Sequence, residues 1–101
     1  FVAVKADEDG TPLWHWQGGT AGYDYFSPVV IGGDGSVVMA GYTTGAWKGT
    51  NEGEGDFAAV KLNEDGEEVW RWQEGTPLKD KMFAAAITQD GSIVLAGYTE
   101  G

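Results

Sequence analysis

The sequence predicts an all-β protein, a β-propeller of four-stranded antiparallel blades with two blades per chain. Three observations lead to this prediction. The chain contains a 56-residue internal repeat, each repeat divides into four short β-rich runs, and some of these runs are apolar on nearly every residue. Repeats of this length indicate stacked supersecondary units, and units of four short strands are typical of propellers.

The repeat is visible because five short motifs recur at the same offset of 56 residues. They are FVAVK (1–5, again as FAAVK at 57–61), EDG (8–10 and 64–66), a WxWQ motif (14–17 and 70–73), DGS (34–36 and 90–92) and AGYT (40–43 and 96–99). Residues 46–56 have no counterpart, so this connector occurs once.

Each repeat divides into four predicted strands joined in pairs by Asp-Gly turns, a strong hairpin signal. In the second repeat the strands are 57–62, 67–73, 83–88 and 92–99. Residues 79–88 also suit a helix, but their repeat counterpart contains Pro28 and β-branched residues, so both are predicted to be strands. Pro28 has no amide hydrogen and therefore favours an edge strand.

The distribution of apolar residues distinguishes a propeller from other all-β folds. Residues 37–42 and 92–98 are apolar nearly throughout instead of alternating. A strand that is apolar on both faces is covered on both faces, as in sheets stacked around an axis. A β-sandwich would leave one face of each strand in water, and a solenoid would need parallel strands in place of Asp-Gly hairpins.

Composition and charge exclude several classes of protein. The 101 residues carry a formal net charge of −10, which argues against nucleic acid as a partner. There is no Cys for disulfides or thiolate metal sites, and no apolar run approaches the roughly 18 residues of a membrane span. The composition indicates no cellular compartment. The first residue is Phe, as expected of a processed, excised or designed chain.

Two runs of sequence resemble a known family. DFAAVKLNEDGEEVW (56–70) and DGSIVLAGYT (90–99) look like the bacterial β-propeller repeats of the SBBP type. The stretch VKLNEDGEEVW (60–70) is also similar to the tryptophan-docking motif of quinoprotein-like propellers. The resemblance covers both repeats apart from the connector. It implies that 83–88 is an innermost strand, followed outward by 92–99, 57–62 and 67–73.

With this order the chain begins and ends inside a blade. Residues 1–25 hold an outer half-blade and a loop, residues 26–82 a complete blade and a loop, and residues 83–101 an inner half-blade. Two strand edges are then left bare, although their counterparts in the complete blade are expected to pair. The bare edges consist of Phe1, Val2, Ala3, Val4, Lys5 and of Ser92, Ile93, Val94, Leu95, Ala96, Gly97, Tyr98, Thr99.

The bare edges predict that the chain assembles with itself head to tail. The inner half-blade of one copy would complete the outer half-blade of the next, and such a contact closes into a ring or continues as a fibre. Two blades per copy give an even-bladed ring, with six blades in a trimer and eight in a tetramer. The tetramer is favoured, because bulky, Trp-rich blades should wedge less sharply.

Loops at one rim of this ring differ between the repeats, and loops on a rigid scaffold commonly carry function. A ligand is therefore expected near Tyr23, Asp24, Tyr25, Trp47 and Asn51, whose side chains suit a carbohydrate. The acidic, Gly-rich segment 50–56 is an alternative calcium site. The competing interpretation is that these loops diverge without binding anything.

The sequence favours a non-catalytic module that needs no cofactor. The paired tryptophans fit packing between blades better than stacking on a sugar or quinone; they are Trp14, Trp16, Trp70 and Trp72. His15 lies between two of them on the opposite strand face, and no triad accompanies it. The alternatives to a self-assembling scaffold are a carbohydrate- or calcium-binding module and a fragment of a quinoprotein-like or hydrolytic enzyme.

Overall fold

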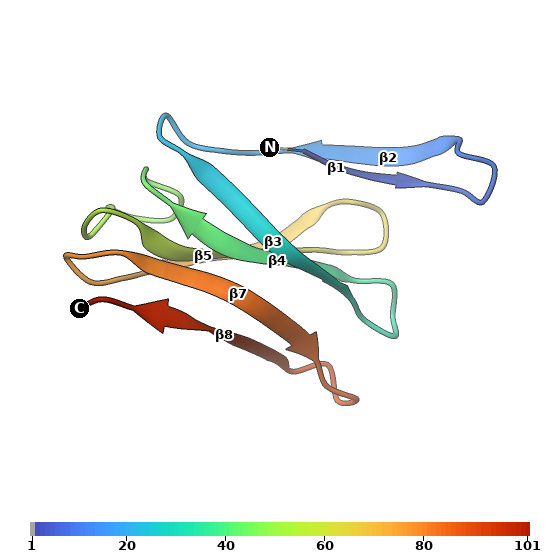
Figure 1. Cartoon of the computed structure of the whole chain (residues 1–101). Helices are drawn as coiled ribbons and strands as arrows, with labels where there is room; N and C mark the ends of the chain where they lie inside the picture. Colours follow the sequence, from blue (N-terminus) through green and yellow to red (C-terminus); the bar gives the residue numbers. More distant parts are fainter. Residues whose placement is uncertain (1) are drawn as a thin grey trace.

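A computed structural model describes residues 2–101 and contains eight β-strands in three antiparallel sheets (Figure 1). The strands are β1 (Val2–Ala6), β2 (Pro12–Gln17), β3 (Asp24–Ile31), β4 (Val37–Thr43), β5 (Asp56–Leu62), β6 (Glu68–Glu74), β7 (Asp80–Ile87) and β8 (Ile93–Thr99). The all-β prediction is confirmed, including a strand where a helix was the alternative. Phe1, part of a predicted edge, lies outside the described residues. No helix in the described range is long and apolar enough to cross a membrane.

The central sheet has four strands in the order β3-β4-β5-β6, and the hairpins β1–β2 and β7–β8 each form a two-stranded sheet. Each hairpin turn carries a glycine with φ between 82° and 86°, a conformation that glycine adopts without steric cost. This requirement explains the Asp-Gly signal in the sequence. Pro28 lies on β3, an edge strand, and the register between β3 and β4 shifts between Phe26 and Val29.

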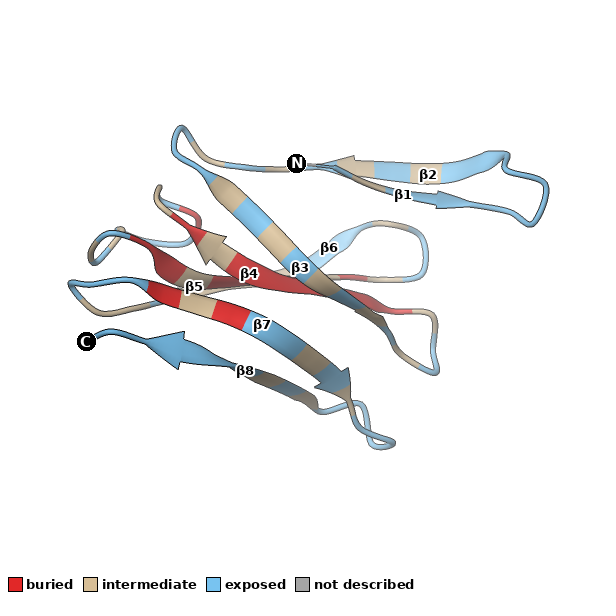
Figure 2. Ribbon diagram, viewed as in Figure 1, coloured by how far each residue is buried: buried red, intermediate tan, exposed pale blue. Residues whose placement is uncertain are grey.

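The two hairpins cover opposite faces of the central sheet. Ala3, Trp14 and Trp16 of the first hairpin pack on a core cluster that includes Met39 and Val60. On the other face, Met82 and Leu95 of the second hairpin join a cluster built around Ala40 and Ala59. Figure 2 shows the buried residues concentrated on β4 and β5, between the hairpins. Burial on both faces explains why β4 and β5 are apolar with little alternation.

Candidate functional site

Two strand edges have no pairing partner within residues 2–101. β1 pairs with β2 alone and β8 pairs with β7 alone. Their counterparts one repeat away, β5 and β4, pair with each other along their whole length. In that pairing Ala40 lies opposite Ala59. The repeat equivalents of these two residues are Ala96 on β8 and Ala3 on β1, one on each free edge.

Equivalent side chains on these strands differ sharply in exposure. Val38 on β4 and Val60 on β5 are both 0% exposed. Val94 on β8 and Val4 on β1, which occupy the same repeat positions, are 55% and 58% exposed. The two free edges are therefore made of residues that the same sequence motif buries elsewhere in the chain. Long apolar edges of this kind favour pairing with another strand.

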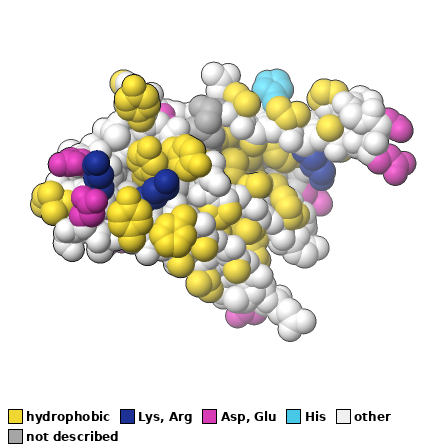
Figure 3. All heavy atoms as spheres, in the orientation of Figure 1, with side chains coloured by type: hydrophobic (Ala, Val, Ile, Leu, Met, Phe, Trp, Pro, Cys, Tyr) yellow, Lys and Arg dark blue, Asp and Glu magenta, His cyan; other side chains and the backbone are white. Residues whose placement is uncertain are grey.

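A groove of about 620 Å³ runs beside the free edge of β1. Residues 2–5 of β1 form one wall, and Phe26, Val37 and Met39 of the central sheet contribute to the other. Hydrophobic side chains gather between the β1–β2 hairpin and β3 in the space-filling view (Figure 3). The groove thus joins a free strand edge to an uncovered part of the apolar face of the central sheet.

Trp14 contacts the turn between β5 and β6. Its indole Nε1 donates a hydrogen bond of 2.9 Å to the carbonyl oxygen of Glu64. A Cβ added to Gly66 would lie 2.5 Å from the Trp14 ring, so only glycine allows the ring to approach this closely. Trp70, the repeat counterpart of Trp14, makes no such hydrogen bond to any described residue, and Gly10, the counterpart of Gly66, has open space around it.

Trp47, expected on the ligand-binding rim, is instead a core residue with 3% exposure. Its ring makes an edge contact with Trp16 at 6.1 Å, and the Arg71 guanidinium lies 4.0 Å above its centroid. Its Nε1 donates to the carbonyl of Ala59 at 3.2 Å. Trp47 is thus buried in the interface between the first hairpin and the central sheet, where no ligand can reach it. Trp72 stacks on Phe57 on the opposite face.

Gln73 holds the start of the connector in place, a role that sequence reasoning missed. Its Oε1 accepts hydrogen bonds from the amides of Trp47 (2.6 Å) and Lys48 (2.7 Å). Its Nε2 donates to the carbonyl of Gly45 and to Asp56 Oδ2. The only sequence signal was that Gln17 and Gln73 recur in both repeats, which did not distinguish an anchor from an ordinary strand residue.

The two expected rim tyrosines are both exposed. Tyr23 is 80% exposed and Tyr25 is 48% exposed. The Tyr25 and Tyr42 rings lie 5.7 Å apart, and Lys81 Nζ lies 4.9 Å from the Tyr25 centroid. A hollow of about 340 Å³ opens beside them, lined in part by Tyr23 and Tyr98. An exposed tyrosine pair with a cation is a surface on which a polar, flat-faced ligand can stack.

Asp24 and Asn51, the other expected rim residues, are occupied by contacts within their own loops. Asp24 accepts hydrogen bonds from the amide of Thr20 (2.6 Å) and the hydroxyl of Thr43 (2.6 Å). Burial raises the pKa of Asp24, but these hydrogen bonds outweigh it and hold the pKa below its usual value. Asn51 Nδ2 donates to the carbonyls of Thr44 and Gly53. Both side chains therefore shape the rim and have little capacity left for a ligand.

Asp80 repeats the arrangement of Asp24. Its carboxylate accepts hydrogen bonds from the Thr76 amide (2.6 Å) and from the hydroxyls of Thr76 and Thr99. Burial raises the pKa of Asp80, and again these hydrogen bonds outweigh it, so the pKa is lowered. The two Asp–Thr clusters fix the start of β3 and of β7, because each Asp is the first residue of its strand.

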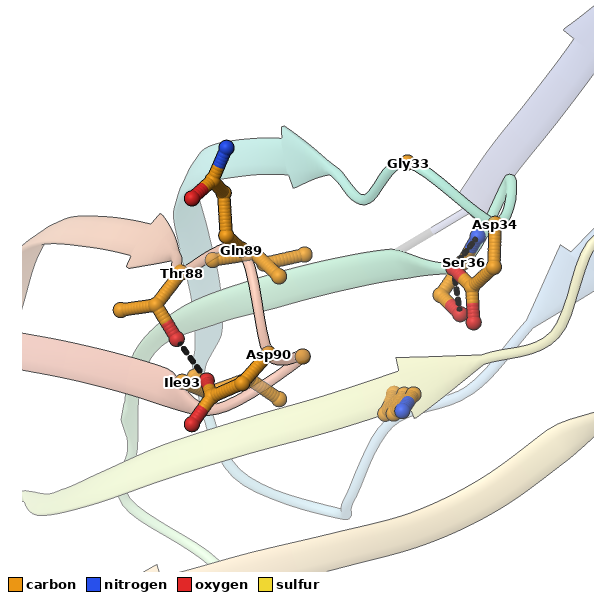
Figure 4. Close-up of a pocket in the computed structure, with 10 residues that line it drawn as sticks. Gly33, Asp34, Ser36, Thr88, Gln89, Asp90 and Ile93 are labelled. Carbon is orange, nitrogen blue, oxygen red and sulfur yellow. Dashed lines mark hydrogen bonds between the residues drawn. The ribbon is translucent and has the colours of Figure 1, made fainter.

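A second hollow, of about 300 Å³, lies between the β3–β4 and β7–β8 turns (Figure 4). Asp34 accepts hydrogen bonds from the amide and hydroxyl of Ser36, and Asp90 accepts one from the Thr88 hydroxyl. The Thr88 bond is the largest cause that lowers the pKa of Asp90 to about 2. These carboxylates close their own turns.

His15 lies on β2 with its side chain exposed. Among residues 2–101 there is no group of three or more His, Cys, Asp or Glu side chains placed to hold a metal ion. No protein-family model matches the chain, and no curated protein matches it in sequence.

Proposed function

We propose that the chain is a non-catalytic β-propeller module that assembles head to tail with copies of itself into a closed, even-bladed ring. β7–β8 of one copy would complete the blade begun by β1–β2 of the next. The observation that carries the proposal is the pairing of β4 with β5, because the same two sequence motifs form the free edges of β8 and β1. The chain thus contains an internal example of the contact between copies.

The internal example predicts the register of that contact. Because Ala40 lies opposite Ala59 and Met39 opposite Val60, we expect Ala96 to lie opposite Ala3 of the next copy, and Leu95 opposite Val4. Seven consecutive residue pairs join β4 to β5. The equivalent contact between copies would remove the exposed Val4 and Val94 side chains from water, which favours association.

The groove beside β1 has the shape and lining that this register requires. Ala40 belongs to the cluster that contains Met82 and Leu95 of the neighbouring hairpin. The equivalents of Met82 and Leu95 one repeat earlier are Phe26 and Met39, which line the groove. Ala96 of another copy, paired in the expected register with β1, would therefore point into this groove against Phe26 and Met39.

The free turn at Gly10 supplies a third complementary contact. Trp14 covers the β5–β6 turn by donating to the Glu64 carbonyl above Gly66. The repeat counterparts of Trp14, Glu64 and Gly66 are Trp70, Glu8 and Gly10. By this equivalence, Trp70 would donate to the Glu8 carbonyl of another copy and cover the open space at its Gly10. A buried indole N–H needs such an acceptor. The contact would link the central sheet of one copy to the first hairpin of the next.

The number of copies follows from the number of blades. Each copy contributes two blades, so a trimer gives six blades and a tetramer eight, both within the usual range for propellers. We propose the tetramer first, because the Trp side chains between the sheets hold neighbouring blades apart and favour a wider ring.

A cysteine cross-link tests the proposed register directly, because the chain contains no native Cys. In the double variant Ala3→Cys and Ala96→Cys, the new thiols would face each other between copies, within the Cα separation that a disulfide requires. Oxidation is expected to give one covalent band of three or four chains on a denaturing gel. The control pairs Ala3→Cys with Leu95→Cys, whose side chain lies on the opposite strand face. Monomeric protein from the first variant, or equal cross-linking of the control, contradicts the proposal.

A second candidate function rests on the exposed rim tyrosines. Tyr23 and Tyr25 with Lys81 would present aromatic faces and a cation to a carbohydrate. In a ring, each copy would repeat this surface on one rim and bind branched glycans at several points. A glycan array screened with the wild type and with Tyr23→Ala tests this function. Binding that is lost in the variant supports it, and the absence of any binding glycan counts against it.

A further inference from the structure

One buried carboxylate oxygen in the described chain has no partner. Asp56, the last residue of the connector and the first of β5, is 0% exposed. Its Oδ2 accepts hydrogen bonds of 2.8 Å from the Glu52 amide and from Gln73 Nε2. Its Oδ1 accepts none from any described residue. Burying a polar oxygen without a partner costs free energy, which points to a ligand bound at Oδ1.

The unpartnered oxygen faces a second buried carboxylate across Gly75. A Cβ added to Gly75 would overlap Asp56 Oδ1 and would lie 2.8 Å from Asp80 Oδ2. Asp80 is 1% exposed, and the Asp80 amide donates to the Gly55 carbonyl at 2.8 Å, which brings β7 against the end of the connector. Two carboxylate oxygens from different sheets thus converge on one small space that is free only because residue 75 is glycine.

The hydrogen-bond donors around the Asp56 and Asp80 carboxylates carry no positive charge. Asp56 receives its hydrogen bonds from an amide N–H and a glutamine side chain, and Asp80 from an amide N–H and two threonine hydroxyls. The one ion pair found among residues 2–101 joins Arg71 to Glu68 elsewhere. Lys81, which lies near Asp80 in sequence, places its Nζ over the Tyr25 ring. The two buried carboxylates therefore lack a positive charge.

We propose that Asp56 Oδ1 and Asp80 Oδ2 bind a calcium ion beside Gly75. Two carboxylates and no nitrogen or sulfur ligand suit a hard cation, and calcium accepts irregular sets of oxygen ligands more readily than magnesium does. Gly75 is partly exposed, so water can complete the coordination. The ion would tie β5 of the central sheet to β7 of the next sheet. The site extends beyond the acidic segment 50–56, because half of it comes from β7.

The repeat provides a matched control. Asp24 is the counterpart of Asp80 and is held by Thr20 and Thr43 in the same way. The connector occurs once in the chain. Asp24 therefore has no described repeat counterpart of Asp56 beside it. Substitutions at Asp56, Asp80 or Gly75 should therefore weaken calcium binding, whereas the corresponding substitution at Asp24 should not.

The test is calcium chloride titration of the whole chain, followed by calorimetry and by thermal unfolding, with magnesium chloride in parallel. We expect one calcium per chain and, above the dissociation constant, a tenfold rise in the folding equilibrium constant for each tenfold rise in calcium. Asp56→Asn and Gly75→Ala should each abolish the response. Asp24→Asn and Gly33→Ala, a glycine with open space around it, should retain it.

Terbium luminescence sensitised by tryptophan gives a second readout that needs no stability measurement. A terbium signal in the wild type that falls when calcium displaces the terbium supports the site. If either Asp56→Asn or Gly75→Ala fails to fold, the terbium luminescence of the variant that folds still shows whether the site binds a cation. The proposal is overturned if the wild type binds no calcium, as expected when water alone fills the space. It is also overturned if magnesium acts equally, or if both Asp56→Asn and Gly75→Ala retain the response.

Discussion

The substitution Val4→Asp tests whether the free edge of β1 is an interface between copies. Val4 is 58% exposed within one chain, whereas its counterpart Val60 is 0% exposed. Full burial of a valine side chain is worth about 1.5–3 kcal/mol, so covering the exposed part of Val4 contributes about 1–2 kcal/mol. A buried carboxylate without a partner adds a penalty of about 3–5 kcal/mol. The sum, about 4–7 kcal/mol, lowers the association constant by roughly three to five powers of ten.

Sedimentation velocity measures this effect, with Leu13→Asp as the matched control. Leu13 is 57% exposed, and its counterpart Val69 in the central sheet is still 55% exposed. An aspartate there stays in water whether or not the copies associate. We expect Val4→Asp to sediment as a folded monomer and Leu13→Asp to remain assembled. If Val4→Asp assembles as well as the wild type, or if both variants dissociate equally, the free edge of β1 is not the interface between copies that its equivalence to β5 predicts.

Three further predictions concern single side chains. Trp70→Phe removes an indole donor that is used between copies in the proposed ring. It should weaken assembly about fivefold in sedimentation, while the single chain keeps its fold. Trp14→Phe removes a hydrogen bond within one chain and should instead lower the melting temperature of that chain. Because the Asp24 pKa is lowered in the folded state, its stabilisation is complete above pH 4 and is lost as the pH falls through the folded pKa; Asp24→Asn should therefore flatten the acid limb of stability against pH. Trp47→Ala should cost about 3–5 kcal/mol in urea unfolding, since the indole is buried, and retention of wild-type stability would contradict its place in the core.

The strands were predictable because their signals are local. The Asp-Gly turns require glycine at positive φ, and β4 and β5 are apolar on both faces because the two hairpins cover both faces of the central sheet. The repeat resolved the one ambiguity, since Pro28 excludes a helix at the position equivalent to β7. Each of these inferences used residues close in sequence, or one repeat copied onto the other.

The rim was less predictable because the connector has no repeat counterpart. Trp47 and Asn51 were assigned to a ligand surface because they lie in a divergent loop and suit a carbohydrate, but Trp47 is buried by Trp16 and Arg71. Its position depends on Gln73, more than twenty residues away. Likewise, the meeting of Asp56 with Asp80 at Gly75 depends on how two sheets pack. Contacts of this kind leave no periodic pattern in the sequence.

The mass of the wild-type assembly in solution shows whether copies of the chain close into a ring, and native mass spectrometry supplies it. One chain has a mass of 10.8 kDa. The proposed ring predicts a single closed species of four chains, or of three, with no ladder of intermediate sizes at high concentration. A monodisperse monomer over the whole concentration range would contradict it, as would an open series of growing oligomers.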